Sequence, residues 1–132
     1  MITWRPAFET GIPVVDRDHR ALIDQINSLS DALHAGAAKE KLTESLVFLN
    51  HYVREHFQRE ESIMNVTRCS ALRENCAAHA ALVAKLDGWV TRLETEGPST
   101  ALVLEVHREC STWLQSHIVR IDCKLRDCGK HK

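Results

Sequence analysis

Four segments of the chain repeat apolar residues at three- and four-residue steps, the period of an amphipathic helix. They run from about residue 17 to 35, from about 39 to 65, from about 72 to a Gly97-Pro98 stop, and from a cap at Ser99 toward Gly129. No segment shows the alternating pattern of a strand. Four helices of comparable length with short connections predict an all-α, antiparallel up-down-up-down four-helix bundle.

The first 15 residues do not fit this pattern. They carry Trp4, Pro6, Phe8, Gly11 and Pro13, which favours an extended N-terminal arm whose aromatic rings pack on the bundle. A chain of 132 residues is long enough for one compact domain and too short for two. We therefore expect a single domain over residues 1–132, with the arm over 1–15 and the bundle over 16–128.

Composition narrows the range of partners. Lys and Arg number 17 against 18 Asp and Glu, so no charged face for nucleic acid or a membrane is expected. No apolar stretch approaches the roughly 20 residues of a membrane span, and the first residues lack a signal peptide, which predicts a cytoplasmic protein.

The five cysteines are odd in number and form no CxxC pair, so we expect reduced thiols.

Polar residues on the apolar stripes are expected to face the bundle core. Each helix contributes one such histidine: His19, His56, His79 and His117. Glu60 lies one turn after His56, and a buried carboxylate costs several kcal/mol unless something positive compensates it. One histidine on a stripe is more often a core residue than a ligand, but four of them with Glu60 indicate a metal site. Nitrogen and oxygen donors without a convergent thiolate favour iron or manganese over structural zinc.

Asp122 is a further candidate ligand that the helical period leaves open. It follows His117 by five residues, which places it about 140° away around an ideal helix. A local widening of the helix, as in a π-bulge, would bring the two side chains together.

At these residues the sequence resembles the hemerythrin family, in its bacterial form, over essentially the whole chain. The resemblance is carried by Trp4 in the arm and by three motifs: Val15-Asp16-x-x-His19, His56-Phe57-x-x-Glu60-Glu61-x-x-Met64, and Trp113-Leu114-x-x-His117-Ile118 followed by Asp122. It implies a bundle that binds two iron ions (Fe²⁺/Fe³⁺) with an oxo or hydroxo bridge.

The resemblance also assigns roles to individual residues. Glu60 and Asp122 would bridge the two irons. His19 and His56 would bind one iron, while His79 and His117 would bind the other. The resemblance further implies dioxygen or another small molecule as the ligand, and apolar neighbours that keep its pocket dry: Trp113, Leu114 and Ile118.

The sequence departs from the family pattern next to the third helix. The family has a third histidine for the second iron four residues before His79, where this chain has Asn75. The family's Tyr-Pro before that helix reads Cys69-Ser70 here. Asn75 would bind iron through its amide oxygen, hydrogen-bond a water on the iron, or leave an extra open position. The thiol of Cys76 is an alternative ligand at the edge of the stripe.

The resemblance implies ligand binding without transformation of a substrate, so the domain by itself is not expected to be an enzyme. Asn75 is expected to loosen the second iron and to favour oxidation over clean release of dioxygen. We therefore predict an oxygen- or redox-sensing domain that regulates an attached signalling output, such as a C-terminal diguanylate cyclase. The alternatives are a free-standing dioxygen carrier or delivery protein, an oxidase-like activity, and a bundle that stores iron or lacks metal.

Overall fold

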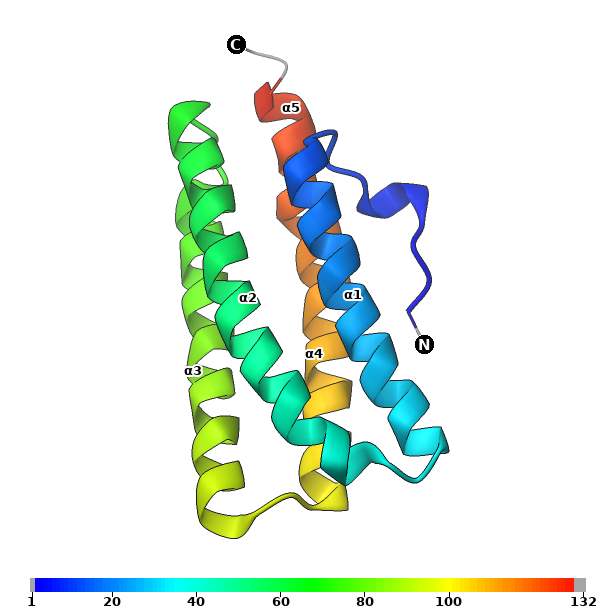
Figure 1. Cartoon of the computed structure of the whole chain (residues 1–132). Coiled ribbons are helices and arrows are strands. Elements are labelled where there is room, and N and C mark those ends of the chain that lie inside the picture. The colour runs from blue at the N-terminus through cyan, green and yellow to red at the C-terminus, as the bar shows by residue number, and fades with distance from the viewer. Residues whose placement is uncertain (1, 130–132) are drawn as a thin grey trace.

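The computed structural model describes residues 2–129, and these form only helices and connections. The four long helices are α1 (Pro13–His34), α2 (Ala38–Val66), α3 (Leu72–Glu96) and α4 (Thr100–Arg120). They run alternately up and down, with α1 and α3 each lying against both α2 and α4 (Figure 1). Three short elements complete the described chain: η1 (Pro6–Phe8), η2 (Asp122–Lys124) and α5 (Leu125–Gly129). The predicted antiparallel four-helix bundle is confirmed.

The helix ends follow local signals in the sequence. Helix α1 begins at Pro13 and not near residue 17, so the arm ends at Ile12. Proline suits the first turn because its missing N–H would have no partner there. Helix α4 begins after Ser99, whose Oγ accepts a hydrogen bond from the Leu102 N–H at 3.1 Å, as the sequence predicts.

The apolar stripes of the four helices form one core along the bundle. Each fully buried Leu, Ile or Val stabilises the fold by about 1.5–3 kcal/mol relative to the exposed side chain. A second, smaller group, which we call the end cluster, closes the bundle end where α5 lies. The end cluster consists of Val15, Met64, Cys69, Ala71, Ile121 and Leu125.

A disulfide joins Cys69, just after α2, to Cys128 in α5. The two cysteines are 59 positions apart in sequence, but the fold brings their Cα atoms to 5.3 Å. The expectation of reduced thiols is therefore wrong for this pair, because an odd number of cysteines does not exclude one long-range bridge. Cys76 and Cys110 are free thiols. The side chain of Cys123 lies outside the described part of the chain.

The N-terminal arm is fastened to the bundle at two points. Asn27 in α1 pairs with the backbone of Ile2 through two hydrogen bonds of 2.7 and 2.8 Å. Arg126 in α5 donates hydrogen bonds to the backbone carbonyls of Pro6, Ala7 and Glu9. Over residues 2–129, no helix has the length and apolar character needed to cross a membrane.

Candidate metal centre

The predicted ligands gather at one end of the bundle. Antiparallel order places the beginnings of α1 and α3 beside the ends of α2 and α4, so His19 and His79 meet residues from late in the other two helices. All six side chains are buried, with Glu60 at 0% and Asp122 at 1% exposure. The structure thus brings together the residues that the sequence selected.

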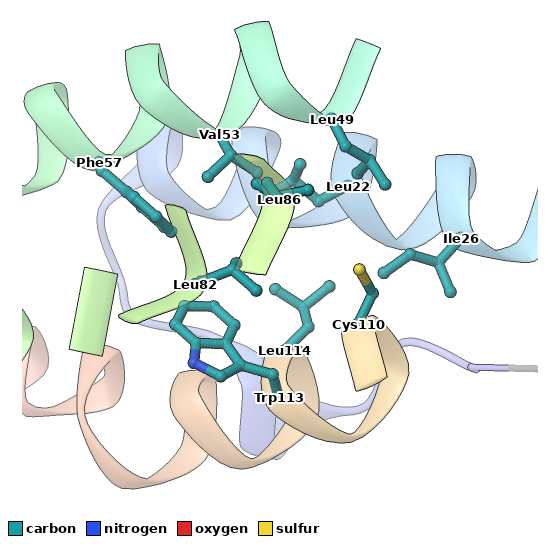
Figure 2. Close-up of a pocket in the computed structure, with 10 residues that line it drawn as sticks. All are labelled: Leu22, Ile26, Leu49, Val53, Phe57, Leu82, Leu86, Cys110, Trp113 and Leu114. Carbon is teal, nitrogen blue, oxygen red and sulfur yellow. The ribbon is translucent and has the colours of Figure 1, made fainter. Parts of the chain in front are cut away.

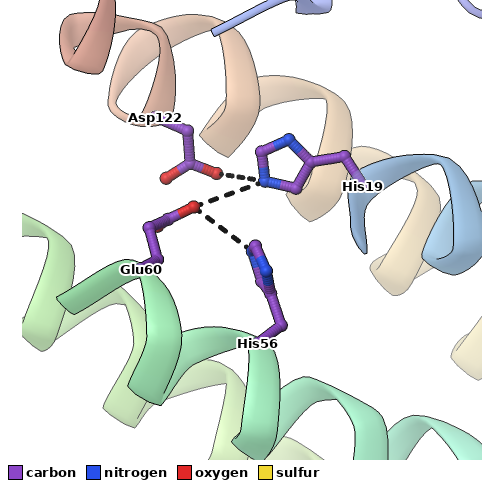
Figure 3. Close-up of side chains that lie close together, drawn as sticks. All are labelled: His19, His56, Glu60 and Asp122. Atoms are coloured by element: carbon purple, nitrogen blue, oxygen red, sulfur yellow. Dashed lines mark ion pairs between the residues drawn. The ribbon is translucent and has the colours of Figure 1, made fainter. Parts of the chain in front are cut away.

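His19 and His56 face one oxygen of Glu60, and His19 also faces one oxygen of Asp122 (Figure 3). His19 Nε2 lies 2.9 Å from Asp122 Oδ2 and 3.4 Å from Glu60 Oε2. His56 Nε2 lies 3.2 Å from the same Glu60 oxygen.

The other oxygen of each carboxylate faces the second pair of histidines. His79 Nε2 lies 3.2 Å from Glu60 Oε1, and His117 Nε2 lies 3.1 Å from Asp122 Oδ1. Two donor groups result, each with one ligand atom per residue within 4.8 Å of the others, and both groups share the two carboxylates. This arrangement is suited to two metal ions held side by side.

Several of these atoms are buried without a hydrogen bond. They are His19 Nε2, His79 Nε2, His117 Nε2, Glu60 Oε2 and Asp122 Oδ1. Each unsatisfied buried polar atom costs about 1–3 kcal/mol, more when the group is charged. Cations bound between these atoms would remove that cost, and imidazole and carboxylate donors suit iron or manganese. The residues present therefore fit a pair of metal ions.

Asp122 reaches the centre because α4 ends. The helix stops at Arg120, and the chain continues through Ile121 into the tighter turn η2, which begins at Asp122. The expected π-bulge is not what the structure uses. A helix end followed by a 3-10 turn changes the direction of successive side chains and makes the five-residue spacing from His117 workable.

Two further carboxylates hold the ligand rings from behind. His56 Nδ1 donates to Asp18 Oδ2 at 3.0 Å, and His79 Nδ1 donates to Glu61 Oε2 at 2.8 Å. Such partners orient the ring so that Nε2 faces the metal. Asp18 is fully buried and was missed from the sequence, because an acidic residue near a helix start resembles a cap.

Electrostatics at the centre follow from these contacts. Burial alone would raise the pKa of Asp18, but hydrogen bonds from His56, Tyr52 and Arg59 outweigh it and hold that pKa well below its usual range. Burial alone would lower the pKa of His19, but the carboxylates of Asp122 and Glu60 raise it to about 9.

The pKa values of His56 and Glu60 shift for the same kind of reason. Despite burial, Asp18 and Glu60 raise the pKa of His56. Despite burial, the surrounding histidines lower the pKa of Glu60 well below its ordinary value. The metal-free centre therefore favours protonated His19 and His56 beside an ionised Glu60, and bound cations would take the place of the imidazole protons.

Asn75 is fully buried on the His79 side of the centre. Its amide nitrogen donates to Glu60 Oε1 at 2.6 Å and to Met64 Sδ at 3.2 Å, while its Oδ1 has no partner. Cys76, the alternative thiol ligand, is in neither donor group and lies half-buried beside Glu61.

Aromatic rings cover the second pair of histidines. Phe57 stacks on His79 with ring centres 3.6 Å apart, and Trp113 stacks on His117 at 4.2 Å. A small apolar cavity of about 20 Å³ lies behind these rings, and Trp113 and Leu114 are among its lining residues (Figure 2). Ile118, the third residue expected at the pocket, is buried in the core beside it and does not line this cavity.

Comparisons with known proteins agree with this geometry. The model of the hemerythrin HHE cation binding domain matches residues 10–125. Bacteriohemerythrin of Methylococcus capsulatus is 29% identical over 131 residues, covering 97% of this chain and 96% of that protein. Hemerythrin of Themiste dyscrita is 28% identical over 123 residues, covering 93% and 89%. A crystal structure of wild-type hemerythrin superposes with a TM-score of 0.84, at 25% identity and 97% coverage of both chains.

Proposed function

Because the chain belongs to the hemerythrin HHE cation-binding family, we propose that its buried centre holds two iron ions and binds dioxygen. One observation carries the proposal: each carboxylate faces histidines on both sides. Glu60 directs one oxygen to His19 and His56 and the other to His79. Asp122 directs one oxygen to His19 and the other to His117. Two shared carboxylates between two sets of imidazoles are the donors that a carboxylate-bridged pair of irons requires.

The chain's own residues would prepare the centre for that ligand. The irons, when bound, supply reversible dioxygen binding and exchange between Fe²⁺ and Fe³⁺. Asp18 and Glu61 orient the His56 and His79 rings, and the stacked Phe57 and Trp113 limit the access of water. The apolar cavity behind them suits a small uncharged molecule.

We assign Asn75 to positioning and not to direct ligation. Its N–H₂ group donates to Glu60 Oε1, and turning the amide over would place Oδ1 against that carboxylate oxygen. Asn75 would then fix the bridging carboxylate and leave the second iron with one imidazole fewer than the family pattern. An iron with fewer imidazole ligands is more open to water and to oxidation, which supports a sensing role.

The proposed role is an oxygen or redox sensor that regulates a signalling output. The alternative is a free-standing dioxygen carrier or delivery protein.

Metal analysis tests the centre directly. The protein reconstituted with Fe²⁺ under nitrogen is expected to hold two irons per chain. His56→Ala should lower that number, because it removes an inward imidazole, whereas His51→Ala should not, because His51 is an exposed histidine on the same helix. A wild-type content well below two, or equal contents in the two variants, would contradict the proposal.

The rate of oxidation in air separates sensor from carrier. Rapid oxidation of the Fe²⁺ protein, followed by absorption, favours the sensor, and a long-lived dioxygen-bound spectrum favours the carrier. Asn75→His is expected to slow oxidation by supplying the missing imidazole. An unchanged rate in a variant that still binds two irons would remove Asn75 from the mechanism.

A further inference from the structure

The Cys69–Cys128 disulfide lies at the metal end of the bundle and has no part in the proposed function. It ties the turn after α2 to α5, the helix that follows the η2 turn carrying Asp122. Cys69 is 6% exposed, in the end cluster, whereas Cys128 is half-buried and packs against that cluster from outside. Cys128 is therefore the more exposed of the two bonded cysteines.

Helix α5 depends on contacts with the rest of the protein. It has only five residues, and a helix so short is not stable by itself. Leu125 is buried in the end cluster, and Arg126 binds the carbonyls of the arm. The ion pair of Lys124, in the preceding η2 turn, with Glu74 at 3.0 Å is exposed and contributes little. Among the described contacts between α5 and the rest of the bundle, the disulfide to Cys69 is the covalent one, so it is the contact expected to hold α5 most firmly.

Asp122 is the proposed ligand that this tether affects. The other ligands lie on the four long helices, but Asp122 lies in the short η2 turn between α4 and α5. One of its oxygens lies 2.9 Å from His19 Nε2, and the other lies 3.1 Å from His117 Nε2. A displacement of this segment would therefore disturb both halves of the centre together.

We propose that the Cys69–Cys128 disulfide is a redox-active site that exchanges with a dithiol, and that its reduction loosens Asp122 and the metal pair. The metal part of this proposal rests on the proposed function, whereas the disulfide part does not. The partner is defined by its chemistry: two neighbouring thiols, in a small molecule or in a protein.

The exchange proceeds in two balanced steps. A thiolate of the dithiol attacks Cys128 Sγ, forming a mixed disulfide and breaking the bond to Cys69, which leaves as a thiolate and takes up a proton. The second thiol of the partner then attacks its own bound sulfur and releases Cys128. Two electrons and two protons pass to the cysteine pair, and the partner leaves as a disulfide.

The test compares the iron-reconstituted protein before and after treatment with dithiothreitol, which is removed under nitrogen before measurement. Mass spectrometry reports the state of both cysteines, hydrogen exchange reports the order of residues 121–128, and transfer to a chelator reports iron release. Cys128→Ser serves as a permanently open form. Cys76→Ser is the matched control, because Cys76 is another partly exposed thiol outside the disulfide.

Reduction is expected to speed amide exchange in residues 121–128 while α1 to α3 remain unchanged, and to speed iron release about tenfold or more. Cys128→Ser should behave like the reduced wild type with or without dithiothreitol, and Cys76→Ser should respond as the wild type does. Equal exchange and equal iron release in the oxidised and reduced proteins would overturn the proposal, as would a pair found as free thiols in the protein purified in air.

The two proposals fail in different ways. A chain that never holds two irons refutes the proposed function, but the exchange of residues 121–128 still tests the disulfide. A protein source of the dithiol is distinguished by repeating the reduction with a thioredoxin-type protein at a concentration far below that of dithiothreitol. Reduction by dithiothreitol alone would assign the site to small dithiols.

Discussion

At the scale of single residues, Asp18 shows how strongly the centre depends on side chains behind the ligands. Its carboxylate accepts hydrogen bonds from His56, Tyr52 and Arg59, at 2.9 to 3.0 Å. It therefore fixes the tautomer and the direction of the His56 ring, and it would keep that ring a strong donor for a metal.

Asp18→Asn is expected to weaken iron binding about 10- to 100-fold, because an amide is a poorer partner for the His56 N–H. Competition with a chelator of known affinity measures the change. Asp24→Asn, an exposed position on the same helix, is the control and should bind iron as the wild type does. Equal affinities in the two variants would show that Asp18 is only structural.

The metal-free protein should lose stability as the pH rises above neutrality. The pKa of His19 is raised from 6.5 to about 9 in the folded state, so its contribution is complete below 6.5 and disappears as the pH approaches 9. The pKa of Glu60 is lowered from 4.5, so its contribution is lost only as the pH falls below that value.

Urea unfolding of the metal-free protein between pH 6 and about pH 9 measures this dependence. His19→Gln should flatten the curve, whereas His51→Gln, at an exposed histidine, should leave its slope unchanged. A wild-type curve that is already flat would show that His19 is not protonated in the folded protein.

At the scale of helices, the ends matter as much as the stripes. Ser99→Ala removes the side-chain cap of α4 and is expected to lower the free energy of unfolding by about 1 kcal/mol. Chemical denaturation measures the loss. Ser116→Ala, at an exposed site inside the same helix, should change stability by less than about 0.5 kcal/mol. A similar loss in both variants would argue against the cap.

The stripes explain why much of the fold and centre could be predicted. A side chain at helical spacing with buried Leu and Val must face the core, so His19, His56, Glu60, His79 and His117 followed from periodicity. The position of Asp122 did not follow from periodicity, because the direction of its side chain depends on where α4 stops. Asp18 did not either, because its partners Tyr52 and Arg59 come from a different helix.

At the scale of the whole molecule, one covalent link closes much of the chain into a loop. The pairing of Cys69 with Cys128 could not be predicted from the sequence, because a contact across 59 positions exists only once the bundle has formed. Such a link restricts the unfolded chain more than the folded one.

Reduction of the disulfide is therefore expected to lower the free energy of unfolding of the metal-free protein by about 2–4 kcal/mol. Urea unfolding with and without a phosphine reductant measures the difference, and Cys128→Ser should be insensitive to the reductant. Coincident transitions of the oxidised and reduced wild type would mean that the link does not constrain the unfolded chain.

The stack of Trp113 on the His117 ring also gives the protein an optical property. Of its three indoles, Trp113 lies in contact with a proposed ligand, whereas Trp4 packs against Phe8 in the arm and Trp89 donates to Glu105. An iron bound beside Trp113 would quench the fluorescence of this indole. The ultraviolet emission of the chain would therefore fall as the centre fills, without any added dye.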